Sequence, residues 1–276
     1  MKKRSWEIED DYEKKRFFDV NQAIDEINVA GYSIINDFLN LDQIEIFKHD
    51  LEKRFDEDKR VCSSAVRGDQ MIVNNLPAYT RIYDEIIADK RILDITSSLL
   101  GIDSILLELR GLNMKKTDKQ DIPFLHRDSM MSTIPGQPIR LVCLLTLDDM
   151  TRDNGATIVI PGTHQLNEKP SKKYVDLFEK KYLEVKRGTA IIMDANLWHG
   201  PSLNYTGKSR WILSLIYGRW FNKPYFEMTK MITEAQFNNL SADLKRLLGF
   251  SSRPPINYRE RTMTVVNGDF IEYNQT

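Results

Sequence analysis

The chain has 276 residues, and its 39 lysine and arginine residues nearly balance its 40 aspartate and glutamate residues, which leaves a formal net charge of −1. Because a neutral chain has no overall field that attracts DNA, RNA or an anionic membrane surface, we expect no nucleic-acid partner. The longest purely apolar stretch is Leu141–Leu145, far shorter than the roughly 20 residues of a membrane span, and the charged N-terminus lacks the apolar core of a signal peptide. These features predict a soluble, cytoplasmic protein with no membrane partner.

The two cysteines, Cys62 and Cys143, are too far apart in the sequence to indicate a disulfide framework or a zinc site. Cys143 also lies inside an apolar run. A reducing compartment is therefore expected.

The first hundred residues predict helices around one strand. A short helix is expected over Asp19–Asn28, with Gly31 as its stop and an alternating strand, YSIINDF, after it. Asn40 is placed to cap a helix with apolar positions at helical spacing, and another amphipathic helix is expected from about Tyr79 to Leu100. The segment 62–78 between these two helices has no clear period.

After Gly101 the sequence changes to short apolar runs separated by turn residues, which is typical of strands. The runs are SILLELRGLNM, IRLVCLLTL, ATIVIPG, YLEVKRGTAIIMD and RWILSLIYGRWF. No helical pattern long enough for repeated βαβ crossovers lies between them, so an antiparallel barrel or jelly roll fits better than a doubly wound sheet.

The C-terminal segment returns to helix, since Thr233 and Gln236 have the spacing of a capping box. No linker separates two domains. We therefore expect one domain over residues 1–276, with a helical N-terminal part (1–100), a β core (102–221) and a C-terminal extension (222–276).

The four histidines differ in their surroundings. His49 lies on the polar side of its predicted helix and is expected at the surface. His126 is followed two residues later by Asp128, and in an extended segment such residues point to the same side. His199 follows an apolar strand and precedes a Gly-Pro turn, where its ring can point into the mouth of a barrel.

Together, His126, Asp128 and His199 make a facial triad of metal ligands. On octahedral Fe(II) such a triad leaves adjacent positions open for a bidentate cosubstrate and O₂. The same ligands can hold Zn²⁺ with a single open position. Both metals fit the residues.

Arg210 begins the next strand, and a guanidinium buried in a barrel is costly unless it binds a carboxylate. A 2-oxoacid with a distal carboxylate fits this position. Strand alternation places Ser214 on the same face as Arg210, as either a substrate contact or a small polar filler.

Four pieces of sequence together resemble the phytanoyl-CoA dioxygenase (PhyH) family of Fe(II)/2-oxoglutarate oxygenases, which includes ectoine hydroxylase. They are HRD at 126–128, TRDNGATIVIPGTH at 151–164, WHG at 198–200 and Arg210. The resemblance covers roughly residues 20–221. It implies a mainly β fold with flanking α-helices: a double-stranded β-helix, that is, a cupin-like jelly roll.

The resemblance also implies the cofactors and their ligands. Fe(II) would be held by His126, Asp128 and His199, with 2-oxoglutarate as cosubstrate, its far carboxylate on Arg210, and O₂ as the oxidant. Asn113 falls where family members place a polar residue against 2-oxoglutarate, with Lys115 and Arg110 as alternatives.

Other residues of the motifs have expected roles. His164 is expected to make structural hydrogen bonds, and Asn154-Gly155 to form a turn. Arg140 either forms a salt bridge at the rim or binds an anionic group of the substrate. Met130 is a candidate for the wall of the substrate site.

The leading hypothesis is an oxygenase that hydroxylates an unactivated C–H bond of a small polar metabolite or natural-product intermediate and releases succinate and CO₂. Desaturation, epimerisation or ring formation would use the same residues, whereas the carboxylate of Asp128 argues against chlorination. A cupin-like metal hydrolase or isomerase would not need Arg210, and a non-catalytic binding protein would be expected to lose a ligand. A monomer or homodimer is expected.

Overall fold

The computed structural model describes residues 18–57, 64–67, 70–117, 125–129, 131–251, 263–266 and 269–272. Its helices are α1 (Val20–Ala30), α2 (Leu41–Glu57), η2 (Leu76–Ala78), α3 (Asp84–Ile87), α4 (Lys90–Leu100), η3 (Thr163–Gln165), α5 (Lys172–Val175), α6 (Met228–Met231), α7 (Glu234–Asn238) and α8 (Ala242–Leu247). Its strands are β1 (Tyr32–Ile35), β2 (Ser64–Arg67), β3 (Gln70–Val73), β4 (Ile105–Met114), β5 (Arg140–Thr146), β6 (Thr157–Ile160), β7 (Lys181–Leu183), β8 (Ala190–Asp194), β9 (Trp198–Pro201), β10 (Ile212–Gly218), β11 (Met263–Val266) and β12 (Asp269–Glu272). Cys62 and Met130 lie outside the described residues.

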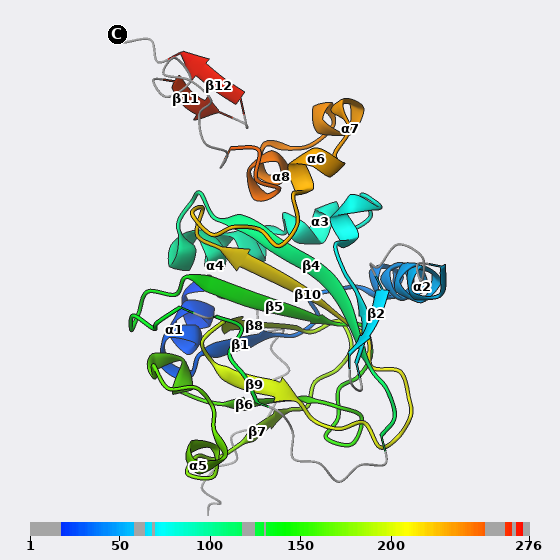
Figure 1. Ribbon diagram of the computed structural model, residues 1–276, viewed down its shortest axis with the longest axis vertical. Coiled ribbons are helices and arrows are strands. Elements are labelled where there is room, and N and C mark those ends of the chain that lie inside the picture. Colours follow the sequence, from blue (N-terminus) through cyan, green and yellow to red (C-terminus); the bar gives the residue numbers. More distant parts are fainter. Residues whose placement is uncertain are drawn as a thin grey trace, which may run out of the picture.

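Two antiparallel sheets form the core (Figure 1). The larger has the strand order β1-β8-β5-β10-β4-β3-β2, and the smaller has the order β7-β6-β9. Val142 and Ile216 of the large sheet pack in one buried cluster with Val159 and Leu183 of the small sheet, so the two sheets face each other. The expected jelly roll is confirmed.

Alternation along β10 sorts the two faces of the large sheet as expected. Ile212 and Ile216 belong to the cluster between the sheets, whereas Leu213 and Leu215 belong to the cluster that the helices share. Because the period of a strand is two, Ser214 lies on the face between the sheets.

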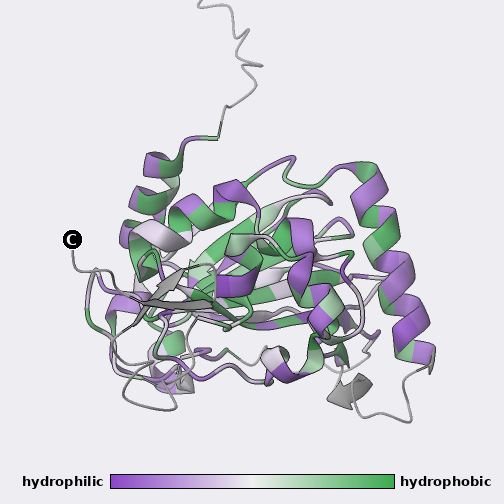
Figure 2. Cartoon of the chain, turned by 90° about the horizontal axis from the view of Figure 1, so that it is seen from above, coloured by the Kyte–Doolittle hydropathy of each residue, from purple (hydrophilic) through white to green (hydrophobic). Residues whose placement is uncertain are grey.

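Helices cover the outer face of the large sheet. In Figure 2, α2 alternates between hydrophilic and hydrophobic stripes, as an amphipathic helix does. Its residues Ile44, Phe47 and Leu51 are buried in the cluster on this face. The predicted start of this helix is confirmed, because Asn40 Oδ1 accepts a 2.9 Å hydrogen bond from the backbone N–H of Gln43.

The N-terminal part is less purely helical than expected, because it supplies three strands of the large sheet. Strand β1 pairs with β8 at one edge, and β2 and β3 extend the sheet beyond β4. The hairpin of β2 and β3 falls in the segment where the sequence showed no period. Strands of four residues are too short to reveal a period of two.

Two predicted elements are divided in the structure. The helix expected from Tyr79 to Leu100 begins only at Asp84 and is interrupted at Ala88–Asp89, because the Asp89 side chain accepts a hydrogen bond from Arg91 N and caps a new helix, α4. The segment YLEVKRGTAIIMD forms β7 and β8, which belong to different sheets. Gly188, with a φ of +83°, lies between them.

The helices at the start of the C-terminal extension pack back on the domain, but the extension is not helical throughout as expected, because β11 and β12 pair as an antiparallel hairpin near its end. The capping box of Thr233 and Gln236 is present at the start of α7. Leu244 and Leu247 of α8 are buried in the same cluster as Leu213 and Leu215, between the large sheet and the helices. Figure 1 shows α6, α7 and α8 grouped beside α3.

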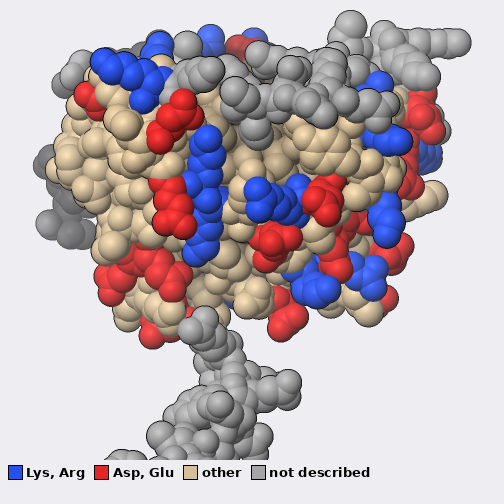
Figure 3. Space-filling model, turned by 90° about the horizontal axis from the view of Figure 1, so that it is seen from below, with Lys and Arg blue, Asp and Glu red and all other residues tan. Residues whose placement is uncertain are grey.

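Among the helices of the described ranges, none has the length and apolar character needed to cross a bilayer. On the face in Figure 3, lysine and arginine side chains are interspersed with aspartate and glutamate side chains. This face therefore presents no extended field of one sign.

Candidate metal centre and cosubstrate site

Backbone pairing brings the two histidines of the expected triad together. His126 N donates to His199 O at 2.8 Å, and His199 N donates to His126 O at 3.0 Å, which makes an antiparallel bridge outside the regular strands. The ring centroids are 4.5 Å apart. The two imidazoles thus lie side by side although 73 positions separate them in the sequence (199 − 126).

Asp128 completes the group. Its backbone N–H, like that of Ser129, donates to Ala195 O, at 2.8 and 3.0 Å respectively, which fixes the loop after His126. The carboxylate oxygens Oδ1 and Oδ2 lie 3.3 Å from His126 Nε2 and 3.4 Å from His199 Nε2.

One ligand atom from each of the three residues lies within 4.8 Å of the others, and within the described part of the chain these three form the one such group of side chains. Two imidazole nitrogens and one carboxylate suit Fe(II) with open positions. His199 Nδ1 lies 2.9 Å from Leu197 O, a contact that orients the Nε2 atom toward the carboxylate and is typical of histidine ligands.

The triad is strongly coupled electrostatically. Burial alone would raise the pKa of Asp128, but His199 and His126 outweigh burial and hold that pKa well below its usual value. Burial alone would lower the pKa of His199, but the charge and hydrogen bond of Asp128 raise it above the usual value. The site therefore stabilises a negative carboxylate surrounded by positive charge, which is the arrangement that a bound divalent cation also supplies.

Arg210 is buried, with 2% of its surface exposed. Its Nε donates to Gly155 O at 2.7 Å, and its Nη2 contacts the same carbonyl. Burial lowers the pKa of Arg210 to about 10, although the charge of Asp148 acts in the opposite direction. No carboxylate of the described residues forms an ion pair with this guanidinium, so an anionic ligand would stabilise it.

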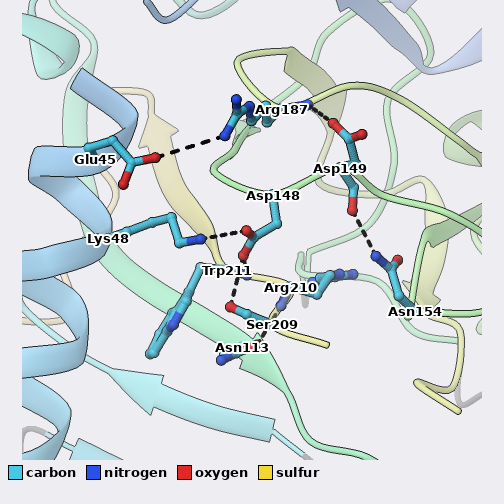
Figure 4. A network of polar contacts seen from close by, with 10 residues as sticks. All are labelled: Glu45, Lys48, Asn113, Asp148, Asp149, Asn154, Arg187, Ser209, Arg210 and Trp211. Atoms are coloured by element: carbon cyan, nitrogen blue, oxygen red, sulfur yellow. Dashed lines mark hydrogen bonds and ion pairs between the residues drawn. The ribbon is translucent and has the colours of Figure 1, made fainter. Parts of the chain in front are cut away.

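Figure 4 shows how the segment around Arg210 is fixed. Asp148 Oδ2 accepts hydrogen bonds from Ser209 Oγ and from Trp211 N, each at 2.9 Å. Its other oxygen, Oδ1, lies 2.6 Å from Lys48 Nζ of α2. Asp148 therefore holds the residues on both sides of Arg210 and connects them to the helix layer.

The predicted turn at Asn154-Gly155 is present. Asn154 Oδ1 accepts a 2.8 Å hydrogen bond from Thr151 N, and its Nδ2 donates to Asp149 O at 2.8 Å. Gly155 has a φ of +101°, a conformation that glycine adopts without strain. The turn presents the Gly155 carbonyl to Arg210, a role that the sequence did not indicate.

Asn113 is close to Arg210 but contacts its backbone. Asn113 Oδ1 accepts a 2.9 Å hydrogen bond from Arg210 N. Strand alternation places Asn113 on the same face as Gly111, where a Cβ atom would lie 2.3 Å from Leu51 of α2. Its contact with 2-oxoglutarate stays a prediction, and Lys115, one of its alternatives, is exposed.

The second alternative to Asn113, Arg110, lies on the opposite face of β4. It is in register with Ser214, and the next pair on the same face of these two strands is Glu108 with Ile216. Arg110 and Glu108 therefore face the interior between the sheets. Glu108 was not among the predicted site residues, although an acidic residue within the apolar run SILLELRGLNM is a signal that the sequence contains.

The remaining predicted residues have defined places. His49 is exposed, as expected. His164 is buried, and its Nε2 lies 3.1 Å from Asn28 O, so it makes the structural contact that was expected of it. Arg140 has no salt-bridge partner within the described ranges; its Nε and Nη1 donate to Asn222 Oδ1 at 3.0 Å and to Tyr225 Oη at 3.1 Å.

Comparisons with known proteins agree with this arrangement. A family model for "Phytanoyl-CoA dioxygenase (PhyH)" matches residues 27–212. The chain is 23% identical over 251 residues to the uncharacterized protein Rv1501 of Mycobacterium tuberculosis, a match that covers 87% of this chain and 90% of that protein. It is 26% identical over 174 residues to the ectoine dioxygenase of Sphingopyxis alaskensis, covering 53% of this chain and 56% of that protein.

Solved structures have the same fold. HygX from Streptomyces hygroscopicus, with nickel, 2-oxoglutarate and hygromycin B bound, matches with a TM-score of 0.60 at 16% identity, covering 74% of this chain and 89% of that chain. The epimerase SnoN, in complex with Fe3+, alpha ketoglutarate and nogalamycin RO, matches with a TM-score of 0.61 at 15% identity, covering 72% of this chain and 83% of that chain. Identities this low establish a likeness of fold alone.

Proposed function

The chain belongs to the phytanoyl-CoA dioxygenase (PhyH) family, and on this premise we propose that it hydroxylates an unactivated C–H bond of a small polar metabolite or natural-product intermediate. The reaction consumes 2-oxoglutarate and O₂ and yields succinate, CO₂ and an alcohol. The observation that carries the proposal is the convergence of His126, Asp128 and His199 in one fold with Arg210, a buried guanidinium that lacks an ion-pair partner among the described residues.

Each of these residues has a defined task. His126, Asp128 and His199 would hold Fe(II), which when bound supplies the activation of O₂. Arg210 binds the distal carboxylate of 2-oxoglutarate through charge-assisted hydrogen bonds and so orients the cosubstrate. The hydrogen bond between His199 Nδ1 and Leu197 O keeps the ring in one orientation while ligands enter and leave.

Three substrate contacts are proposed. Arg140 is linked to the metal centre through the backbone, because Arg140 O accepts from Ala195 N and Ala195 O accepts from Asp128 N. It therefore lies at the rim, where Tyr225 is 46% exposed beside it. Ser214 faces the interior between the sheets, and Met130 remains a proposal from the sequence.

Epimerisation is the second candidate for the outcome, because SnoN, which has the same fold, is an epimerase. Desaturation and ring formation would use the same residues. A metal hydrolase or isomerase is less well supported, since neither reaction needs Arg210. A non-catalytic binding protein is less well supported too, since the triad is complete.

We also propose a cellular location, a class of partner and an oligomeric state. A cytoplasmic location fits the buried free thiol of Cys143. The mixed charges on the face in Figure 3 favour a small-molecule substrate over nucleic acid or a membrane surface. We propose a monomer or homodimer.

Product analysis under ¹⁸O₂ tests the proposal. Protein loaded with Fe(II) and 2-oxoglutarate is incubated with a panel of polar metabolites, and succinate and products are measured by mass spectrometry. Hydroxylation predicts a product heavier by one ¹⁸O atom. An unchanged mass with inverted configuration indicates epimerisation, and a loss of two hydrogens indicates desaturation. Stimulation by an acyl-CoA alone would overturn the proposed substrate class.

A further inference from the structure

An acidic and a basic side chain of β4 project between the two sheets. Glu108 pairs in register with Ile216, and Arg110 pairs with Ser214. Paired residues of antiparallel strands share a face, and Ile216 belongs to the cluster between the sheets. Glu108 and Arg110 therefore line the side of the large sheet that faces the small sheet.

Glu108 is buried and Arg110 is half-buried, and both side chains are incompletely paired. Glu108 is 4% exposed, and its Oε2 lies 3.3 Å from Nη1 of Arg110. That ion pair lacks the geometry of a hydrogen bond. Among the described residues, no donor reaches Glu108 Oε2 and no acceptor reaches the buried Nε of Arg110. Buried polar groups without hydrogen bonds are costly, which makes such a pair unusual in a strand that only packs.

The charges of Glu108 and Arg110 also interact with those of the metal centre. Burial raises the pKa of Glu108, the charge of Arg110 opposes this, and the charge of Asp128 raises the pKa further. Arg110 in turn lowers the pKa of His199, although other contacts of that histidine outweigh it. His199 is in register with Val159, a member of the cluster between the sheets, so it lies on the face of the small sheet that looks toward Glu108 and Arg110. A group bound by Glu108 and Arg110 would thus lie near the triad.

The cosubstrate does not match Glu108. Both carboxylates of 2-oxoglutarate accept hydrogen bonds and carry negative charge, so they repel Glu108 rather than satisfy it. A hydroxyl group donates one hydrogen bond and accepts others. Two neighbouring hydroxyls, or a hydroxyl beside an amine, can donate to Glu108 and accept from Arg110 at once.

We propose that Glu108 and Arg110 form a substrate subsite that binds neighbouring hydroxyl groups, or a hydroxyl next to an amine, beside the metal centre. This inference rests on the proposed function and narrows its substrate class to polyhydroxylated or aminohydroxylated compounds. Glu108 is the specificity-determining residue, and Arg110 holds it and supplies the complementary donor.

The test uses small probes and a paramagnetic metal. Full-length protein is loaded with Mn(II) and 2-oxoglutarate, and the proton relaxation of cis-1,2-cyclohexanediol is compared with that of cyclohexanol. Wild-type protein should enhance the relaxation of the diol saturably and more than that of the alcohol. The Glu108→Gln variant should weaken diol binding about tenfold, as the loss of a charge-assisted hydrogen bond predicts.

Two further variants make the result specific. Glu227→Gln is the matched control, because Glu227 is exposed and forms an ion pair with Lys230 at the surface, and this variant should bind the diol as the wild type does. Glu108→Met removes both oxygens and should reduce diol binding to the level of cyclohexanol. Equal relaxation of diol and alcohol in the wild type, or unchanged diol binding in both Glu108 variants, would overturn the inference.

The cosubstrate is measured in the same samples by the absorption of the anaerobic Fe(II) and 2-oxoglutarate complex. If the wild type fails to bind 2-oxoglutarate, the proposed function itself fails. If only the Glu108 variants lose 2-oxoglutarate, Glu108 serves the cosubstrate, and the inference fails while the proposed function stands.

Discussion

Asp148 Oδ2 accepts a 2.9 Å hydrogen bond from the backbone N–H of Trp211, and the same oxygen accepts from Ser209. One carboxylate thus holds the chain on both sides of Arg210. Because Lys48 holds the other oxygen, the position of Arg210 depends on the helix layer as well as on the sheet.

Replacing Asp148 with alanine should therefore affect the cosubstrate more than turnover. The variant leaves the Trp211 N–H without its acceptor, which we expect to cost about 1–3 kcal/mol of stability. The KM for 2-oxoglutarate should rise severalfold, with a smaller change in kcat. Steady-state kinetics and thermal unfolding measure both effects.

The control for this prediction is Asp176→Ala, since Asp176 is exposed and lies 3.9 Å from Lys180 in a surface ion pair. This variant should change neither the KM for 2-oxoglutarate nor the stability of the protein. A loss of stability in Asp148→Ala with an unchanged KM for 2-oxoglutarate would show that Asp148 supports the fold without positioning Arg210.

Alanine substitution of His126, Asp128 or His199 should abolish turnover and leave the fold largely intact, because an open metal site does not form the core. Asp128→Glu should also be severely impaired, since an added methylene moves the carboxylate by more than the ~0.5 Å that site geometry tolerates. Succinate release and bound iron are the measurements. Near-native turnover in one alanine variant would exclude that residue as a ligand.

The metal-free protein should depend on pH in a specific way. The pKa of Asp128 is held well below its usual value, so its contribution to stability is present above about pH 4 and is lost as the pH falls through the folded-state pKa. The pKa of His199 is raised above 6.5, so its contribution is present below 6.5 and is lost as the pH rises through the folded-state pKa.

Both contributions come from the same ion pair, which is therefore most stabilising between about pH 4 and pH 6.5. In this window Asp128→Asn should lower the Tm of the metal-free protein, and the difference should shrink at pH 9. Thermal unfolding without metal tests this, and a difference that grows with pH would contradict the assigned signs.

Gly188 provides a test of the packing that connects the N-terminal segment to the sheet. Its carbonyl accepts hydrogen bonds from Phe38 N and Leu39 N, and a Cβ atom would lie 2.7 Å from Leu39 O. Gly188→Ala should therefore destabilise the protein by more than about 2 kcal/mol.

Gly162→Ala separates the two causes of this loss. Gly162 also has a positive φ, +81°, but a Cβ atom there would meet nothing within 4 Å. The Gly162→Ala variant should lose only the free energy of backbone strain, about 1 kcal/mol of stability. Equal losses in urea unfolding would mean that contact with Leu39 is unimportant.

Much of the fold was predictable where the pattern was long. The strands containing Arg140 and Ser214 and the helix after Asn40 were found because apolar period and caps agree. The break before α4 was not found, because Asp89 caps a helix within an unbroken apolar pattern. Capping competes with continuation of the helix, and the outcome depends on tertiary contacts.

The parts of the candidate site that could be predicted are the side chains that belong to sequence motifs. The histidines converge as expected, yet the backbone bridge between His126 and His199 that brings them together leaves no mark in the sequence. The Gly155 carbonyl could not be predicted either, since any residue has one. Asp148 was missed because its partners become neighbours only through the fold.

The role of Arg210 beside the triad is measured by the visible absorption of the anaerobic protein titrated with Fe(II) and 2-oxoglutarate, in the wild type, in Arg210→Met and in the exposed control Arg187→Met. We expect the weak charge-transfer band of the chelate in the wild type and in Arg187→Met, with about 100-fold weaker affinity for 2-oxoglutarate in Arg210→Met. No band in the wild type, or equal affinity in all three proteins, would show that Arg210 and the triad do not form a 2-oxoglutarate site.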